Sequence, residues 1–438
     1  MKTLITTAFA WVMTLGTALA GVQIQEVTSP GGVKAWLVED HSIPFMALQV
    51  SFKGGASLDA PGRRGATYLM MGLLEEGSAD LDAIAYTQAL EALAASVEYD
   101  STDDYVSISA RFLSENRDQF IPLLRDTLMK PRFDQDAVDR VRDQVLSGLA
   151  NDAKDPDKIA SSAFSAMAFG DHPYGSSEKG TIESVSALTR DDMLGAHARV
   201  FARDRLVVGA VGDITPEALG EMLDTLFADL PESSVPLPDK ADVTIAGGET
   251  VIEYATPQSV AVFGQIGIDR HDEDFFAAYV LNQVLGGGSF ESRLMSEVRE
   301  KRGLTYGVYS YLAPRDYASI YLGSVASAND RIAEAIEVIR GEWERAATEG
   351  VSAQEVEDAK TYLTGAYPLR FDGNTRIARI LVGMQMDDLP IDYIQNRNAK
   401  VEAVTLEDVN RVAAELLDPD GLHFVVVGQP QGLDSSTN

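Results

Sequence analysis

Two stretches of the chain alternate apolar and polar residues, and amphipathic segments follow each of them. The apolar positions are Met46, Leu48, Val50 and Phe52 in the first stretch and Val260, Val262, Ile266 and Ile268 in the second. A period of two residues predicts β-strands that bury one face. We therefore expect each stretch to open a unit in which helices follow strands.

The clearest helices are predicted in the second half of the chain. Apolar residues recur there at helical spacing, at Ile332, Ile336, Ile339 and Trp343. Ser352 and Glu355 form a capping box, which marks the start of the next helix. Strands and helices together predict an α+β fold.

Six residues of the first half reappear in the second half at a constant offset of 216 positions. The pairs are Ala187 and Ala403, Thr189 and Thr405, Asp192 and Asp408, Leu206 and Leu422, Val211 and Val427, and Gly212 and Gly428. In both copies a Thr-capped helix leads into a Val-rich strand that ends in glycine, which indicates an ancient duplication. The Pro-rich stretch within 231–248 has the composition of a semi-rigid linker between a domain at 21–230 and a domain at 249–438.

The first 20 residues have the layout of a secretory signal. An apolar run follows Lys2, and Ala18 and Ala20 offer small residues for cleavage before Gly21. The run is shorter than the roughly 20 residues that span a bilayer, so we expect cleavage, no membrane span in the mature chain, and a periplasmic or otherwise exported location. The chain has no cysteine, which excludes disulfides and thiolate metal ligands.

The chain is strongly acidic, with 67 acidic and 36 basic residues among 438 and a formal charge of −31. A charge of this sign argues against binding to nucleic acid or to anionic membranes. One short segment reverses the balance, because Arg293, Arg299, Lys301 and Arg302 lie within ten residues. We expect an anionic or carbonyl-rich group to be held there.

The basic cluster lies on a predicted helix that ends in a tight turn. Leu294, Met295 and Val298 recur at helical spacing. Gly303 would end the helix in the left-handed conformation, and a strand that includes Tyr306 would follow. Cations are favoured at a helix C-terminus by the helix dipole, which explains Lys301 and Arg302 adequately. For Arg299, the dipole and a functional role are equally good explanations.

A run of small residues precedes this helix, at Gly286, Gly287, Gly288 and Ser289. Glycines permit close approach and positive φ, so these residues would let an extended peptide lie along the main chain. A plain flexible turn is the alternative. The spacing of a phosphate-binding loop is absent.

These motifs resemble the insulinase/pitrilysin-type zinc peptidases, a family that includes mitochondrial processing peptidase and the core proteins of respiratory complexes. The resemblance covers essentially all of the chain after residue 20 and rests on the stretches 53–62, 169–175 and 286–306. It implies two tandem homologous LuxS/MPP-like metallohydrolase domains that form a clamshell. Two such clamshells would enclose a chamber around the scissile peptide.

The zinc site that the resemblance implies is missing from this sequence. The His-x-x-Glu-His motif of the family should fall at 65–77, where Tyr68, Met71 and Gly72 occupy the positions of the first histidine, the glutamate and the second histidine. The third ligand, a glutamate, should lie near Ser147 and Gly148. We therefore expect Tyr68 and Met71 to be ordinary packing residues.

The distribution of histidines leads to the same expectation without the family. The five are His41, His172, His197, His271 and His423, and no two are closer than 25 residues. A helical zinc site needs two imidazoles about one turn apart. We expect no metal cofactor in this chain, and structural roles for His172 and His423.

The resemblance also assigns a role to Arg299 and Tyr306, which match the pair that the family uses opposite the zinc. The leading hypothesis is a zinc-less subunit, inactive alone, of an exported heterodimeric metallopeptidase. Arg299 and Tyr306 would be its catalytic contribution, peptides its substrates, and a zinc-bearing His-x-x-Glu-His subunit its partner. The alternatives are a structural or recruitment protein without any role in proteolysis, and a self-sufficient peptidase with another metal arrangement.

Overall fold

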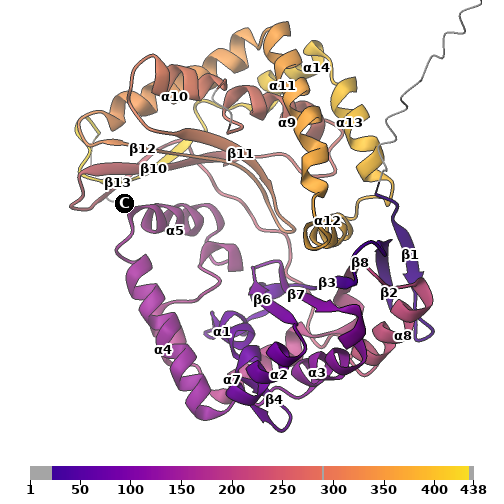
Figure 1. Ribbon diagram of the computed structural model, residues 1–438. Helices are drawn as coiled ribbons and strands as arrows, with labels where there is room; N and C mark the ends of the chain where they lie inside the picture. The colour runs from indigo at the N-terminus through magenta and orange to yellow at the C-terminus, as the bar shows by residue number, and fades with distance from the viewer. Residues whose placement is uncertain (1–21, 289–290, 434–438) are drawn as a thin grey trace, which may run out of the picture.

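The computed structural model describes residues 22–288 and 291–433, which form two halves that face each other (Figure 1). The predicted signal at 1–20 and the candidate Ser289 lie outside the described residues. Each half contains one mixed sheet with helices packed on it, indigo to magenta for the first half and orange to yellow for the second. Among the described residues, no helix is long and apolar enough to cross a membrane.

The first half contains a six-stranded sheet in the order β1-β2-β8-β3-β7-β6. Its strands are β1 (Gln25–Thr28), β2 (Lys34–Glu39), β3 (Phe45–Lys53), β6 (Ser96–Ser101), β7 (Tyr105–Leu113) and β8 (Leu206–Gly212), and β4 (Gly77–Ser78) pairs with β5 (Leu81–Asp82) beside it. The helices are α1 (Ala66–Leu73), α2 (Ala83–Ala92), α3 (Arg117–Met129), α4 (Gln135–Asp152), α5 (Pro156–Phe169), α6 (Ile182–Ser186), α7 (Arg190–Val200) and α8 (Pro216–Phe227).

The second half repeats this plan with a five-stranded sheet in the order β9-β13-β10-β12-β11. Its strands are β9 (Gly248–Glu253), β10 (Gln258–Ile266), β11 (Val308–Pro314), β12 (Ser319–Ala328) and β13 (His423–Gly428). Its helices are α9 (Phe275–Leu285), α10 (Ile332–Glu349), α11 (Ala353–Ala366), α12 (Asn374–Met386), α13 (Tyr393–Ala403) and α14 (Leu406–Leu416). Without β1, the two sheets have the same order, and each has one parallel pair, β2 with β8 and β9 with β13.

The local structure confirms the internal repeat. The hydroxyl of Thr189 donates to Asp192 at 2.7 Å at the start of α7, and the hydroxyl of Thr405 donates to Asp408 at 2.6 Å at the start of α14. Both are complete capping boxes, and the two helices begin and end 216 residues apart. The capping box predicted at Ser352 is confirmed as well.

Both central strands are buried on two faces, which the alternation pattern did not predict. On β3 the expected residues from Met46 to Phe52 are buried, but so are the residues between them. On β10 the expectation was wrong at its end, because Ile266 is 56 % exposed and Ile268 lies beyond the strand. Ala261 and Phe263 face the helical core there, which places the predicted residues on the opposite face of the sheet.

That opposite face is covered by a helix from the other half of the chain (Figure 1). Helix α5 packs on β10 and β13, and α12 packs on β3 and β8. Glycines allow the close approach, since a Cβ at Gly264 would lie 2.7 Å from the ring of Phe164 on α5. A Cβ at Gly209 would lie 2.8 Å from the main-chain oxygen of Ala378 on α12. The two sheets are therefore joined by an exchange of helices.

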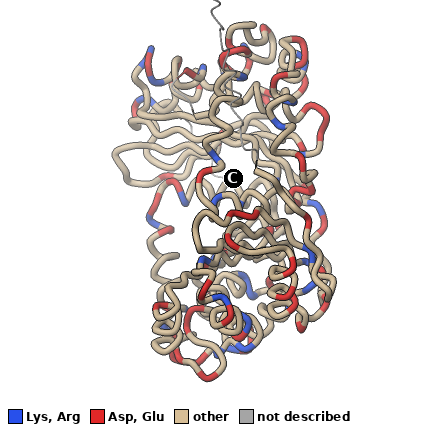
Figure 2. Tube along the Cα trace, turned by 45° about the vertical axis from the view of Figure 1, so that its right-hand side comes forward, with Lys and Arg blue, Asp and Glu red and all other residues tan. Residues whose placement is uncertain are grey.

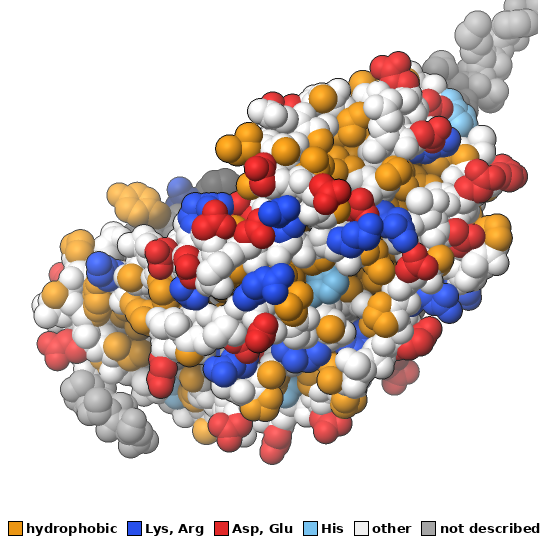
Figure 3. Space-filling model, turned by 90° about the horizontal axis from the view of Figure 1, so that it is seen from below, with side chains coloured by type: hydrophobic (Ala, Val, Ile, Leu, Met, Phe, Trp, Pro, Cys, Tyr) orange, Lys and Arg blue, Asp and Glu red, His pale blue; other side chains and the backbone are white. Residues whose placement is uncertain are grey.

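Charged residues are spread along the chain in both halves of the molecule (Figure 2). On the face seen from below, basic and acidic side chains lie next to one another (Figure 3). Typical pairs are Arg125 with Asp229 and Arg140 with Glu76. Exposed pairs of this kind contribute little stability individually, about 0–1 kcal/mol.

Candidate functional site

Helix α1 carries the three residues at the motif positions, and a buried carboxylate fixes where it begins. Asp59 accepts hydrogen bonds from the main-chain N–H of Gly65 at 2.8 Å and of Thr67 at 2.9 Å. Gly65 has φ of 95°, and a Cβ there would lie 2.5 Å from the oxygen of Lys179. The stretch before the helix therefore determines the direction in which α1 projects its side chains.

The motif positions on α1 and α4 meet at one cavity of ≈ 370 Å³. Tyr68, Met71 and Gly72 line it from α1, and Gly148 lines it from α4. Ser147 instead lines a neighbouring surface hollow. Met71 is 2 % exposed and packs in the core as expected, whereas Tyr68 is half-buried at the cavity wall. The fold thus brings the two segments to one cavity, and no side chain at these positions suits zinc.

Other polar side chains of this cavity are paired or partly buried. Burial, reinforced by the charges of Glu76 and Glu98, raises the pKa of Glu75. Glu76 forms an ion pair with Arg140. Lys179 also lines the cavity, and its ammonium lies 2.8 Å from Asp152. The described side chains that line the cavity therefore carry charges of both signs but do not form a set of metal ligands.

No metal site is recognised in the part of the chain that the structure describes, since no group of three or more histidines and carboxylates there could hold an ion. His423 is buried, with Nδ1 2.7 Å from the oxygen of Ala246 and Nε2 2.9 Å from the hydroxyl of Thr250. The Nδ1 of His172 accepts a hydrogen bond from the N–H of Tyr174 at 3.2 Å. Both histidines have structural roles, as expected.

The glycine run follows α9, and two of its residues are required by packing. A Cβ at Gly286 would lie 2.4 Å from the hydroxyl of Ser310, and a Cβ at Gly287 would lie 2.5 Å from the amide oxygen of Gln283. The N–H of Gly286 donates to Asn282 at 2.9 Å, and its oxygen accepts from Ser310 at 2.8 Å. The main chain of Gly286 is therefore occupied within the domain.

Gly288 differs from its two neighbours. It has φ of 83°, and a Cβ there would meet nothing within 4 Å. Conformation rather than crowding favours glycine at this position. Within this run, Gly287 is half-buried and Gly288 is exposed, and the N–H of Gly288 donates to the oxygen of Gly286 at 2.8 Å.

In the basic cluster, carboxylates of the same domain pair with Arg293, Lys301 and Arg302. Arg293 makes a two-point contact with Glu355, at 2.6 and 2.9 Å. Lys301 and Arg302 both donate to Glu297, each at 2.7 Å. These pairs anchor the segment, and for Lys301 and Arg302 they add a structural role to the one expected from the helix dipole.

Arg299 lies in a π-helical turn, Met295–Glu300, and is half-buried. The N–H of Lys301 donates to the oxygen of Ser296 at 3.0 Å, five residues back, which is the spacing of a π-helix. Gly303 has φ of 60° and ends the helix, as predicted. Such π-helical turns are often found at functional sites.

Tyr306 precedes the strand in which it was predicted, because β11 begins at Val308. The hydroxyl of Thr305 donates to the oxygen of Ala326 at 2.6 Å and accepts from the N–H of Gly307 at 3.1 Å, so the main chain on both sides is fixed. The side chain of Tyr306 is 88 % exposed. The loop before β11 therefore presents the phenol of Tyr306 to solvent, seven residues after Arg299.

Two family models match successive parts of the chain. The model for insulinase (peptidase family M16) matches residues 34–181, and the model for the peptidase M16 inactive domain matches residues 187–363. The chain belongs to the insulinase family, peptidase family M16. The expected fold of two M16-type domains is thereby confirmed.

Relatives of this M16 protein cover nearly its whole length. It is 28 % identical over 393 residues to a protein of Helicobacter pylori described as the non-peptidase homolog YmxG, with 89 % of this chain and 90 % of the relative covered. It is also 28 % identical over 410 residues to an uncharacterized zinc protease of Streptomyces coelicolor, with 90 % and 87 % covered.

Solved structures show the same architecture. A peptidase M16 inactive domain from Pseudomonas fluorescens superposes with a TM-score of 0.87 at 29 % identity, covering 93 % of this chain and 98 % of that one. A protease from Helicobacter pylori shares the fold, with a TM-score of 0.84 at 16 % identity over 93 % of this chain and 100 % of that one. Together with the missing ligands, these comparisons support an inactive member of the family.

Sequence reasoning did not single out Glu75, Tyr99 or Lys179 as residues of the motif cavity. Tyr99 comes from β6 and Lys179 from the loop before α6, so only the fold brings them beside α1. The adjacent acidic residues Glu75 and Glu76, directly after the motif segment, were the one local signal.

Proposed function

We propose that this chain is the zinc-less subunit of an exported heterodimeric metallopeptidase and that it assists peptide hydrolysis with Arg299 and Tyr306. The partner, an M16 subunit with His-x-x-Glu-His, supplies the zinc and the general base. The observation that carries the proposal is an asymmetry between the two halves: the cavity at Tyr68, Met71 and Gly72 persists without ligands, while the segment with Arg299 and Tyr306 is intact and anchored.

The chemistry of the two side chains suits peptide hydrolysis. Attack on a peptide carbonyl builds negative charge on its oxygen, and donors aimed at that oxygen lower the barrier. A guanidinium and a phenol are both such donors. Pairing of Arg293 with Glu355 and of Arg302 with Glu297 holds the segment, so little reorganisation is needed when substrate enters.

The glycine run provides the neighbouring part of the proposed site. Gly287 is half-buried and Gly288 is exposed, and both lie a few residues before the anchored helix. The N–H of Gly288 donates to the oxygen of Gly286 at 2.8 Å, so the remaining main-chain groups of the two residues would meet an extended peptide. Ser289 belongs to the same proposed substrate-binding run. Export, which rests on the signal-like residues 1–20, would place both subunits in a periplasm-like compartment.

The test is peptide cleavage by the reconstituted pair. The purified chain is mixed with an M16 subunit that carries His-x-x-Glu-His, and turnover of a fluorogenic peptide is measured. Arg299→Ala and Tyr306→Phe should each lower kcat by about 10²-fold, the loss typical of one oxyanion donor. Arg302→Ala is the matched control, because Arg302 lies in the same segment but pairs with Glu297.

Three outcomes count against the proposal. Turnover unchanged by Arg299→Ala would remove its central residue. Copurification with other assembly components, and never with a zinc peptidase, would favour a recruitment protein without a role in proteolysis. Stoichiometric zinc in the isolated chain would favour a self-sufficient peptidase.

A further inference from the structure

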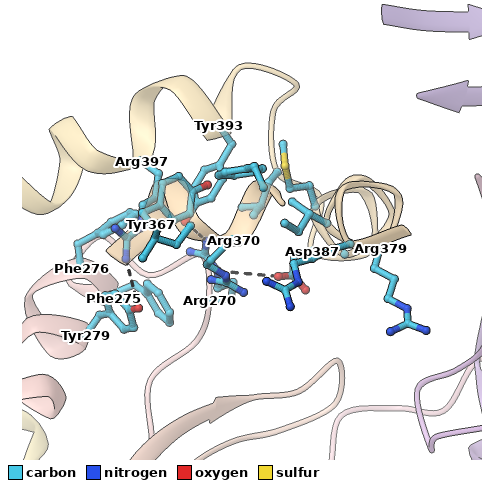
Figure 4. A pocket seen from close by; sticks show the side chains of 17 residues that line it. Arg270, Phe275, Phe276, Tyr279, Tyr367, Arg370, Arg379, Asp387, Tyr393 and Arg397 are labelled. Atoms are coloured by element: carbon cyan, nitrogen blue, oxygen red, sulfur yellow. Dashed lines mark hydrogen bonds and ion pairs between the residues drawn. The ribbon is translucent and has the colours of Figure 1, made fainter. Parts of the chain in front are cut away.

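A second cavity, of ≈ 680 Å³, lies in the second half between α9, α12, α13 and the turn Tyr367–Phe371 (Figure 4). It is larger than the motif cavity and lies within the size range of small-molecule sites, about 300–1,000 Å³. Aromatic rings form one side of it, among them Phe275, Tyr279 and Tyr367. None of the candidate residues discussed above lines this cavity.

The charge of the lining is opposite to that of the protein. Five arginines line the cavity, Arg270, Arg370, Arg376, Arg379 and Arg397, against one carboxylate, that of Asp387. The whole chain carries −31. A concentration of guanidinium groups in such a chain gives the cavity a local field that attracts anions.

Two of the arginines build the wall. Arg397 is 5 % exposed, donates to the oxygen of Leu363 at 2.7 Å and lies 4.5 Å from the ring centre of Tyr367. Arg270 donates to the hydroxyl of Tyr393 at 2.7 Å and lies over Phe275. These contacts fix the aromatic rings and cations relative to one another, so the site is formed before a ligand arrives.

Two others have unused donors. Arg370 and Arg376 are exposed, and no hydrogen bond or ion pair joins either of them to another residue within the described ranges 22–288 and 291–433. Figure 4 shows Arg370 among the side chains that line this cavity. Guanidinium groups bind carboxylate and phosphate with two parallel hydrogen bonds, so these side chains are suited to an anionic group.

The cavity also touches the contact between the two halves. Arg379 extends away from the aromatic cluster in Figure 4 and donates to Glu98 on β6 at 2.9 Å. The opposite face of α12 packs on the first sheet through Ala378 and Leu381. One helix therefore forms a wall of the cavity and the cover of the other half's sheet.

We propose that this cavity binds a small organic anion, a carboxylate or phosphate group attached to a flat apolar body. The body would stack against Phe275 and Tyr367, and the anionic group would be bound by Arg370 and Arg376. Such a ligand has two possible sources, a free small molecule and the terminal carboxylate of a peptide that ends in an aromatic residue. The site is distinct from the segment 286–306 and does not depend on a zinc-bearing partner.

The experiment is calorimetric titration of the full chain with defined probes. Phenyl phosphate and phenylacetate represent the free ligand, and Gly-Gly-Phe with a free carboxylate represents the peptide terminus. Three control probes each lack one part of the proposed ligand. Inorganic phosphate lacks the aromatic body, and benzyl alcohol and the amide of Gly-Gly-Phe lack the anionic group. Arg370→Gln and Arg376→Gln remove the unused donors, and Arg117→Gln on α3 is the control for a surface arginine.

We expect at least one of the complete probes to saturate with Kd below about 1 mM, and each of the two variants to weaken it at least about tenfold. The control variant should bind like the wild type. Saturation by phenyl phosphate or phenylacetate identifies a free ligand, and saturation by the peptide acid alone identifies a peptide terminus.

The remaining outcomes overturn the proposal. These are no saturation by any complete probe, equal binding of inorganic phosphate or benzyl alcohol, and equal affinity in the two variants. Sedimentation with anionic vesicles without binding of any soluble probe would replace the proposal with a lipid surface. Circular dichroism of each variant separates a lost site from a lost fold.

Discussion

Replacing Arg315 with methionine should loosen the contact between the two halves without unfolding either. Arg315 follows β11, and its guanidinium reaches the first half, 2.7 Å from Asp103 and 3.7 Å from Asp104. It also lies 3.4 Å from the ring centre of Tyr174. Methionine keeps the apolar stem of the side chain but removes the charge, so the variant isolates the ion pairs and the cation–π contact.

The magnitude follows from burial. Removing one partner of a fully buried ion pair costs about 3–5 kcal/mol. The side chain of Arg315 is 29 % exposed, and Asp103 keeps its contact with Arg64, so we expect a smaller cost of about 2–3 kcal/mol. The equilibrium constant for opening this contact should therefore rise roughly 30- to 150-fold.

Amide hydrogen exchange measures this opening directly. The N–H of Tyr317 in the second half donates to the hydroxyl of Tyr174 in the first half at 3.1 Å, across the contact. Its exchange should accelerate by the factor above, whereas that of Leu48 in the centre of β3 should not change. Arg117→Met, which breaks an exposed pair with Asp118, is the control.

Two results would refute the reasoning. If the N–H of Tyr317 exchanges at the wild-type rate in Arg315→Met, the ion pairs do not hold the halves together. If the exchange of Leu48 accelerates as much as that of Tyr317, the variant destabilises the whole fold and the contact is not a separate unit.

Three further substitutions test the supports of the fold. Burial opposes ionisation of Glu355, but bonds from Arg293 and Ser352 outweigh it and lower its pKa to about 2. The stabilisation by ionised Glu355 is present above about pH 4.5 and is lost as pH falls toward 2. Glu355→Gln should therefore lower the urea midpoint at pH 7 and make the midpoint decrease less as the pH is lowered. Gly209→Ala forces a Cβ against the main chain of α12 and should cost about 1–3 kcal/mol in urea unfolding, whereas Gly383→Ala, with open space, should cost less. Thr405→Ala removes one capping box and should cost about 1 kcal/mol by the same measurement.

The features predicted well from the sequence are those set by neighbours along the chain. The Thr caps expected at Thr189 and Thr405 depend on side chains three residues apart, and both are present, as complete capping boxes. The left-handed turn at Gly303 is likewise local. Substitution of the zinc ligands could be seen because the motif has fixed spacing on one helix.

The features that were missed depend on partners far along the chain. On β10 the alternation of residues predicted a strand correctly, but it did not predict which face meets the helices of the same half. The predicted apolar face is covered instead by α5 from the other half. The pairing of Arg293 with Glu355, 62 residues apart, could not be read from the basic cluster. The second cavity gathers Arg270 and Arg397 from segments more than 120 residues apart, so its charge is visible only in the fold.

The fold itself explains how the ligand positions can lack ligands while the architecture persists. A Cβ at Gly72 would make only an ordinary contact with Val141 at 3.5 Å, and a Cβ at Gly148 would meet nothing within 4 Å. Neither position therefore fills the core, whereas Met71, next to Gly72 on α1, is buried and adds apolar packing. Metal ligands at these positions would project into the cavity and contribute little to stability without a metal. The cavity and its ligands are thus physically separable, and a chain can keep the first without the second.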